Sequence, residues 1–148
     1  MTDRDLDQEW EELIEEHRLA MPGPQVLFAF LLILPFQNRF EKLDAGQVAV
    51  YYSALLCAAA AIVLLIAPTA AHRIEWRRGD KEGLLQLATK TAIAATVFLA
   101  FGMTAAVYLI TDFLYGEPWT AIVGGILGGG FVVFWFGVPV VRRLRDRR

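Results

Sequence analysis

The chain has 148 residues, 56% of them hydrophobic, a mean hydropathy of +0.44 and a net charge of −2. It is too short for several domains and too apolar for an ordinary soluble protein, so one membrane domain is expected. The single cysteine, Cys57, leaves neither a disulfide framework nor a cysteine metal site. The acidic first eighteen residues do not resemble a signal peptide, so we expect no cleavable leader.

Residues 1–18 are predicted to form an amphipathic helix at the cytoplasmic surface. Its apolar positions recur at helical spacing, and carboxylates cover the rest of its surface. The apolar stripe consists of Leu6, Trp10, Leu13 and Ile14, with His17 on the same side. The segment holds eight acids against two arginines, which disfavours anionic lipid headgroups as its binding surface. We therefore expect a protein surface to hold this helix.

Residues 19–141 are predicted to form an all-α membrane domain of four transmembrane helices, and residues 142–148 a basic cytoplasmic tail. Each span is built around an uncharged apolar stretch, and about 20 such residues cross a bilayer core of roughly 30 Å. The four predicted spans are residues 22–40, 46–67, 88–112 and 119–141.

The first span is the weakest of the four, because its strongly apolar part covers only residues 26–36. The Met21-Pro22-Gly23-Pro24 sequence is expected to break the helix before the span begins. Pro35 is expected to free the carbonyl of Leu31 and to bend the helix near its end. A re-entrant segment, which enters and leaves the bilayer on one side, is the alternative for this stretch.

Small residues at helical spacing predict close packing between the spans, because helices in lipid associate where backbones can approach each other. The strips are Ala54, Ala58 and Ala61 in the second span, and Ala92, Thr96, Ala100 and Thr104 in the third. Tyr51 and Tyr52, near the entrance of the second span, are predicted to be interfacial anchors.

The fourth span carries two overlapping Gly-x-x-x-Gly pairs formed by Gly124, Gly125, Gly128 and Gly129. These glycines are predicted to be helix-packing residues, because only backbone atoms limit the approach of a neighbouring helix there. Three interpretations remain open: packing inside one bundle, contact between copies in an oligomer, or a flexible gate. A metal ion or another cofactor is not expected.

The charges predict the orientation of the chain. If the four spans alternate, the N-terminus, the 72–90 connection and the C-terminal tail share one side, which holds twelve of the fourteen Lys and Arg residues. Positive residues concentrate in the cytoplasm, so both termini are predicted to be cytoplasmic, in a bacterial cytoplasmic membrane. The acidic N-terminal helix is then expected to dock on a basic cytoplasmic surface.

The run MPGPQVLFAFLLILPFQNRF, the APTAAHR that closes the second span and the four-span plan resemble a family of small bacterial membrane proteins of unknown function. The resemblance covers nearly the whole chain. Some members of that family carry a sodium/proton antiporter label, which implies ion transport as one function to consider. The resemblance implies no site residues.

Polar residues that could serve an ion pathway are few, and they are Gln25, His72, Arg73, Lys90 and Asp112. Lys90 and Asp112 are 22 residues apart, so one helix would hold them ~33 Å from each other. Each is therefore expected to be an interfacial anchor rather than part of a relay near the midplane. The two histidines, His17 and His72, are expected on surface segments.

Motifs of hydrolases, metalloproteases and nucleotide-binding loops are missing from the sequence, so no enzymatic activity is expected. The acidic N-terminus also disfavours nucleic acid as a partner. The predicted function is a non-enzymatic interaction, scaffold or accessory subunit that forms oligomers or binds another membrane protein in the lipid bilayer. The alternative is a small ion transporter or channel of the sodium/proton antiporter kind.

Overall fold

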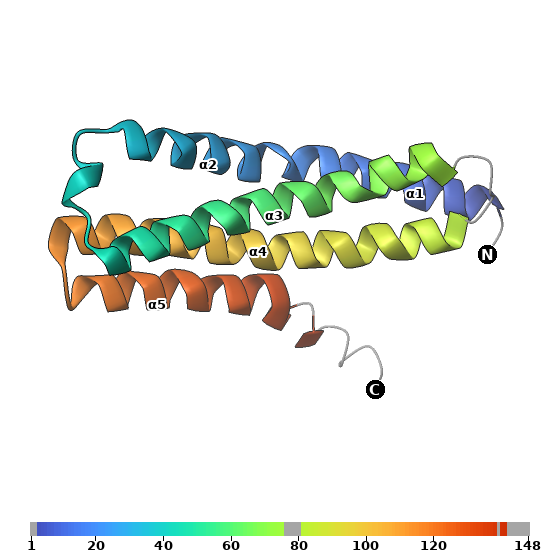
Figure 1. The fold of residues 1–148 in the computed structure, drawn as a ribbon. Coiled ribbons are helices and arrows are strands. Elements are labelled where there is room, and N and C mark those ends of the chain that lie inside the picture. Colours follow the sequence, from blue (N-terminus) through green and yellow to red (C-terminus); the bar gives the residue numbers. More distant parts are fainter. Residues whose placement is uncertain (1–2, 76–80, 139, 142–148) are drawn as a thin grey trace.

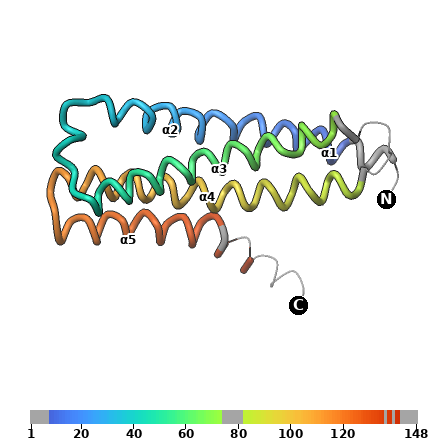
Figure 2. Tube along the Cα trace, viewed as in Figure 1, coloured from blue at the N-terminus to red at the C-terminus, as the bar shows by residue number. Residues whose placement is uncertain are grey.

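The computed structural model describes residues 3–75, 81–138 and 140–141 of the chain, and the fold is all-α, as predicted. Helices α1 and α2 follow one another along one side of a long bundle, α3 and α4 form its centre, and α5 covers part of the opposite side (Figures 1 and 2). The elements are α1 (Asp3–Ala20), α2 (Pro22–Ile33), the 3₁₀ turns η1 (Leu34–Phe36) and η2 (Phe40–Lys42), α3 (Ala45–Glu75), α4 (Lys81–Tyr115), α5 (Trp119–Phe131) and the π-helical segment η3 (Val132–Gly137).

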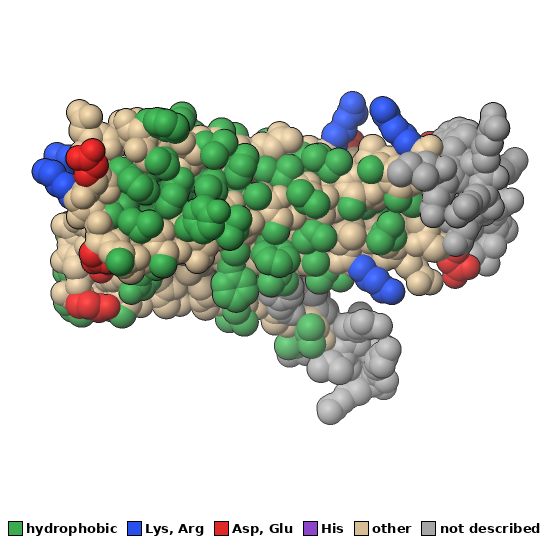
Figure 3. All heavy atoms as spheres, viewed as in Figure 1, with side chains coloured by type: hydrophobic (Ala, Val, Ile, Leu, Met, Phe, Trp, Pro, Cys, Tyr) green, Lys and Arg blue, Asp and Glu red, His purple; other side chains and the backbone are tan. Residues whose placement is uncertain are grey.

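Three helical stretches are long and apolar enough to cross a membrane, namely Gln8–Phe36, Ala45–Arg73 and Glu82–Tyr115. At most 28% of the apolar window in each stretch is buried within the protein. Helices this apolar on all sides need either a large protein core or lipid around them. Apolar side chains spread over the middle of the bundle, and charged side chains lie toward its ends (Figure 3). This distribution is that of an integral membrane protein.

The break between α1 and α2 is confined to Met21. Its backbone is itself helical, with φ −57° and ψ −44°, and its N–H donates to the carbonyl of His17 at 3.0 Å. Pro22 and Pro24 lie in the first turn of α2, where the backbone N–H groups have no partner within the helix in any case. The chain therefore continues in nearly the same direction, and α2 continues the line of α1 (Figure 2).

The predicted alanine strip of α3 is confirmed. Ala54, Ala58 and Ala61 are fully buried, and Leu65 continues the strip at the same three-to-four-residue spacing. Helix α4 meets this strip at Gly102, where an added Cβ would lie 3.4 Å from the Ala54 carbonyl oxygen. The two backbones therefore touch at this level, which is the contact that small residues permit in lipid.

The predicted small-residue strip of α4 is not the most buried face of this helix. The most buried residues of α4 are Leu84, Ala88, Ala95, Gly102, Ala106, Leu109 and Thr111. Ala92, Thr96, Ala100 and Thr104 are only half-buried, and Thr104 lies against Gly128 of α5. Helix α4 packs against α3, α5 and α1, and the strip meets α5 at Thr104.

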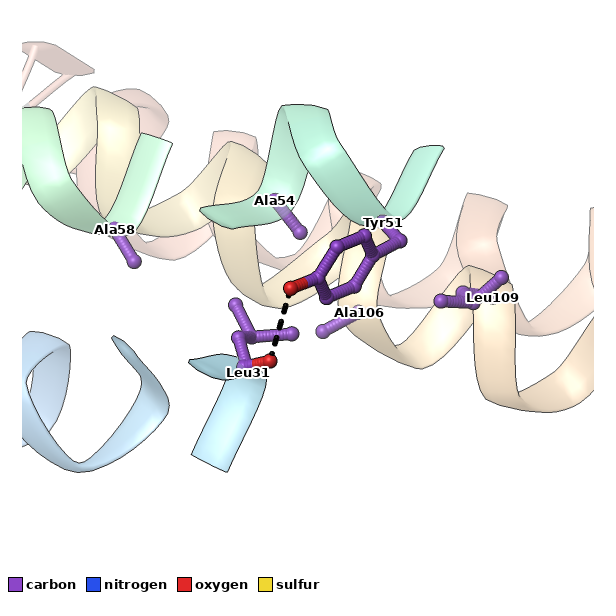
Figure 4. Packing of buried hydrophobic residues seen from close by; sticks show 6 residues of the cluster. All are labelled: Leu31, Tyr51, Ala54, Ala58, Ala106 and Leu109. Atoms are coloured by element: carbon purple, nitrogen blue, oxygen red, sulfur yellow. Dashed lines mark hydrogen bonds between the residues drawn. The ribbon is translucent and has the colours of Figure 1, made fainter. Parts of the chain in front are cut away.

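Pro35 has the effect expected from its missing N–H. Helix α2 ends at Ile33, and the carbonyl of Leu31, which Pro35 cannot bond, accepts a hydrogen bond from the Tyr51 hydroxyl at 3.1 Å (Figure 4). The Tyr51 ring also packs edge-on against Phe40. The prediction of Tyr51 as an interfacial anchor is wrong, since it is only 5% exposed and links α3 to α2. Tyr52 is exposed.

The fourth predicted span, 119–141, is a shorter α-helix than the sequence indicates. It ends at Phe131, and the backbone widens into the π-helical segment η3. The N–H of Val132 is shared between the carbonyls of Gly128 and Gly129 at the end of α5. Consecutive glycines have low helix propensity and so stabilise a helix poorly. Beyond them, the rings of Phe131 and Trp135 pack together with centroids 4.6 Å apart.

Candidate functional site

The glycines of α5 form two separate faces. Gly124 and Gly128 point toward α4: an added Cβ at Gly124 would lie 3.2 Å from Tyr108 Cδ2, and one at Gly128 would lie 3.6 Å from Thr104 Cγ2. An added Cβ at Gly125 or Gly129 would have no atom of the described chain within 4 Å. One Gly-x-x-x-Gly pair therefore packs inside the bundle, and the other opens outward.

The outward face, defined here as Gly125, Gly129, Ile122, Ile126 and Val133, is exposed and apolar. Ile126 is 72% exposed, Val133 54% and Ile122 48%. Residues four apart lie on one side of a helix, so Ile122, Ile126 and Val133 form a ridge next to the two glycines. A ridge beside a glycine groove is the shape that a second helix of the same kind can complement.

A polar cluster fixes the N-terminal end of α5 to the rest of the bundle. Asp44 and Gln47 form a capping box at the start of α3, with the Gln47 N–H donating to Asp44 Oδ1 at 2.9 Å and the Asp44 N–H donating to Gln47 Oε1 at 3.2 Å. Gln47 Nε2 then donates to Asp112 Oδ2 at 2.7 Å. The fully buried Thr120 hydroxyl lies 3.4 Å from Asp112 Oδ1 and 3.1 Å from the Gly116 carbonyl. Asp112 therefore joins α3, α4 and α5.

Replacing Asp112 with alanine is expected to loosen α5 from α3 and α4, at a cost of about 1–2 kcal/mol in the free energy of unfolding. The substitution removes the acceptor of the Gln47 amide and one of the two acceptors of the Thr120 hydroxyl. Glu117→Ala, which removes an exposed acid from the neighbouring loop, is the matched control and should change stability by less than about 0.5 kcal/mol. Unfolding titrations in detergent measure both. Equal stability of the two variants would contradict the linking role of Asp112.

The residues considered for an ion pathway are not brought together. Gln25 is exposed, and its amide lies 3.7 Å from Met21 Sδ. His72, near the C-terminal end of α3, stacks against Trp10, whereas Asp112 lies near the C-terminal end of α4. These two helix ends lie at opposite ends of the bundle (Figure 1). The two remaining candidates, Arg73 and Lys90, are exposed. The anchor interpretation of Lys90 stays a prediction, while Asp112 has the packing role described above.

A cavity of about 230 Å³ lies between α4 and α5, and Thr104 supplies its polar side chain. The other lining residues are Val97, Ala100, Phe101, Gly128, Phe131 and Val132. The Thr104 hydroxyl donates to the carbonyl of Ala100 at 2.7 Å, and that of Thr96 to Ala92 at 2.9 Å. Both hydroxyls thus bond within their own helix, and the cavity walls are almost entirely apolar.

Two features of this site and its surroundings were missed from sequence. The Asp44-x-x-Gln47 spacing is a capping-box signal, although it does not reveal that Gln47 also reaches Asp112. His17 was expected on a surface segment, but it is buried, with 8% exposure. Its position on the same stripe as Trp10, Leu13 and Ile14 is the signal that could have placed it inward.

The chain belongs to a family of unknown function, DUF6328, whose model matches residues 1–139. This agrees with the resemblance drawn from the first span and the end of the second. No curated protein and no solved structure matches the chain.

Proposed function

We propose that this protein is a non-enzymatic membrane scaffold or accessory subunit that self-associates in the bilayer through the outward face of α5. The observation that carries the proposal is the division of the glycines. Packing inside the bundle uses Gly124 and Gly128, so it does not account for Gly125 and Gly129, which stand open beside exposed isoleucines. A second copy presenting the same face would bring glycine against glycine.

The properties of the bilayer favour the outward face of α5 as the surface of self-association. Burying an isoleucine against a neighbouring helix gains little in lipid, because lipid tails are equally apolar. Association therefore depends on close backbone approach, and the paired glycines of the outward face permit it. A face that meets itself gives a closed twofold dimer, which is the commonest symmetry among oligomers.

The proposed topology has four spans with both termini in the cytoplasm of a bacterial cell. The shorter helix α5 would cross with the help of its π-helical continuation, η3. The start of α1 and the end of α5 point toward the same end of the bundle (Figure 1). The distribution of Lys and Arg then supports placing that end inside the cell.

Ion transport by this chain has less support than assembly. Coupled transporters place ionisable side chains near the membrane midplane. Among the described residues, Asp112 and Lys90 lie 22 residues apart on α4, and the Thr96 and Thr104 hydroxyls bond their own helix. These positions favour a scaffold, whose function is to hold a partner and to present the acidic helix α1.

A leucine at Gly125 is expected to convert the assembly to monomers while leaving the fold intact, because its side chain would extend into the space a second helix needs. Light scattering of the protein in mild detergent measures the mass, and circular dichroism reports the fold. Gly125→Leu should lower the mass about twofold if the assembly is a dimer.

Ala29→Leu is the matched control, since it adds a leucine at an exposed position of α2. It should keep the mass of the parent protein. Gly128→Leu provides the contrast, because its side chain would press on Thr104 and disturb the bundle itself. An unchanged mass in a folded Gly125→Leu variant would exclude the outward face as the interface.

A further inference from the structure

A second pocket lies where the turns η1 and η2 meet the C-terminal end of α4, at one end of the bundle (Figure 1). Its volume is about 160 Å³, and its walls are almost entirely apolar. The turns and the residue after them supply Leu34, Phe40 and Leu43, and α4 supplies Leu109, Ile110 and Phe113. Apolar cavities of about 150 Å³ take up apolar ligands rather than water. The pocket can therefore hold part of a hydrocarbon chain.

The mouth of this pocket is cationic. Arg39 is the one charged residue among its described lining residues, and it is exposed. Because the walls are apolar, the carbon chain of Arg39 covers them and its guanidinium reaches outward, as long cationic side chains do on apolar surfaces. The structure records no ion pair between this guanidinium and a described residue. The acids of the same loop, Glu41 and Asp44, do not line the pocket.

The aromatic residues at this end of the bundle indicate the level of the lipid headgroups. Phe36, Tyr115 and Trp119 are all exposed here, where α4 ends and α5 begins (Figure 1). Tyrosine and tryptophan gather at the boundary between headgroups and hydrocarbon. Charged side chains lie at the same end, next to the apolar surface of the bundle (Figure 3). Arg39 is therefore at the height of lipid phosphates, and the pocket beside it is at the height where acyl chains begin.

We propose that this pocket binds an anionic phospholipid, with part of one acyl chain inside it and the phosphate on the Arg39 guanidinium. The planar guanidinium can donate two parallel hydrogen bonds to phosphate oxygens. An acyl chain gains little by leaving other lipid tails, so the choice of lipid depends on charge. An anionic headgroup complements the single cation of the mouth, whereas a zwitterionic headgroup brings a second cation close to it. The site shares no residue with the outward face of α5, so it does not depend on self-association there.

Native mass spectrometry of the full-length protein in detergent tests the site, because it counts bound lipids. The probes are dioleoylphosphatidylglycerol, which is anionic, and dioleoylphosphatidylcholine, which is zwitterionic. The parent protein should bind the first molecule of the anionic lipid about fivefold or more tightly than that of the zwitterionic lipid, the effect of one basic residue near an anionic headgroup. Arg39→Gln should remove this preference. Lys42→Gln, which removes the same charge from η2 outside the pocket, should keep the affinity within about twofold.

A tryptophan at Ile110 tests whether the acyl chain enters the pocket. Ile110 lines the pocket and is 55% exposed, so the larger side chain has room to fold and should occupy the space of the chain. Ile110→Trp should weaken binding of the anionic lipid about fivefold or more. Ile93→Trp is the matched control, because Ile93 is also 55% exposed on α4 but does not line the pocket. Leu114→Trp, at another exposed lining residue, covers the case in which Ile110→Trp does not fold.

Three results would overturn the proposal. The first is equal affinity of the parent protein for the two lipids. The second is an equal loss in Arg39→Gln and Lys42→Gln, which would show that only the net charge of the loop matters. The third is unchanged binding of the anionic lipid in a folded variant with tryptophan in the pocket, since the acyl chain would then lie elsewhere.

Discussion

A leucine in place of Gly102 is expected to destabilise the folded chain by about 2–3 kcal/mol, because it forces the two central helices apart. An added Cβ at this position already lies 3.4 Å from both the Ala54 carbonyl oxygen and Cys57 Cβ, and 3.5 Å from the Ala58 backbone nitrogen. The remaining leucine atoms have no room between the backbones of α3 and α4. Unfolding by titration with a denaturing detergent measures the loss.

Gly130→Leu is the matched control for Gly102→Leu, because an added Cβ there meets no atom of the described chain within 4 Å. It also replaces glycine inside a helical segment with a better helix former, which stabilises by about 0.5–1 kcal/mol. The two leucines should therefore shift stability in opposite directions. If Gly102→Leu were as stable as the parent protein, the close approach of α3 and α4 would be wrong.

Replacing Trp10 with alanine is expected to release α1 from the bundle and to raise its hydrogen-exchange rate roughly 10- to 100-fold. Trp10 is half-buried, and its ring stacks on His72 at an interplanar angle of 32°. Losing this contact removes apolar area and an aromatic pair worth about 0.5–1.5 kcal/mol beyond it. Exchange over residues 8–20 reports the release.

Gln8→Ala is the control for Trp10→Ala on the same helix. Gln8 is exposed, and its amide donates only to Glu12 of its own helix, at 3.2 Å. Its removal should change the exchange rate by no more than about threefold, as surface substitutions do. Equal exchange in the parent, in Gln8→Ala and in Trp10→Ala would mean that Trp10 does not hold the helix.

The membrane character and the alanine packing of the chain follow from its sequence because both depend on local patterns. Long uncharged stretches predicted the apolar helices Ala45–Arg73 and Glu82–Tyr115, and the spacing of Ala54, Ala58 and Ala61 predicted the buried strip of α3. The first predicted span, 22–40, is wrong in its bounds, because the long apolar stretch runs over Gln8–Phe36 and takes in part of the acidic segment. The Met21-Pro22-Gly23-Pro24 sequence predicted a break that is only one residue long. A proline in the first turn of a helix removes no hydrogen bond, because the N–H groups there have no partner within the helix.

The specific contacts between helices depend on rotation and register, which residue patterns do not determine. Five glycines drew attention to α5, but the close approach of α4 to the α3 backbone uses the single Gly102. Tyr51 matched the composition of an interfacial belt, yet its hydroxyl donates to the Leu31 carbonyl, which Pro35 cannot bond and which also accepts the Leu34 N–H. Sequence also could not distinguish Gly124, which faces Tyr108, from Gly125, which faces outward.

The widening of the chain after Phe131 could not be predicted from hydropathy either. Residues 132–137 are as apolar as a regular span, so the sequence predicted a continuous helix over 119–141. The structure instead has a π-helical segment over Val132–Gly137, directly after the glycine-rich turn.

Cross-linking of a cysteine at Gly129 in native membranes tests the proposed assembly most directly, with Cys57→Ala removing the natural thiol. Two copies that meet at the outward face should bring these cysteines within disulfide reach, with Cβ atoms about 3.5–4.5 Å apart. Mild oxidation should then yield a dimer from Gly129→Cys and little from Phe30→Cys, which is 68% exposed on α2. Equal dimer yields from the two positions, or none from Gly129→Cys, would contradict self-association through α5.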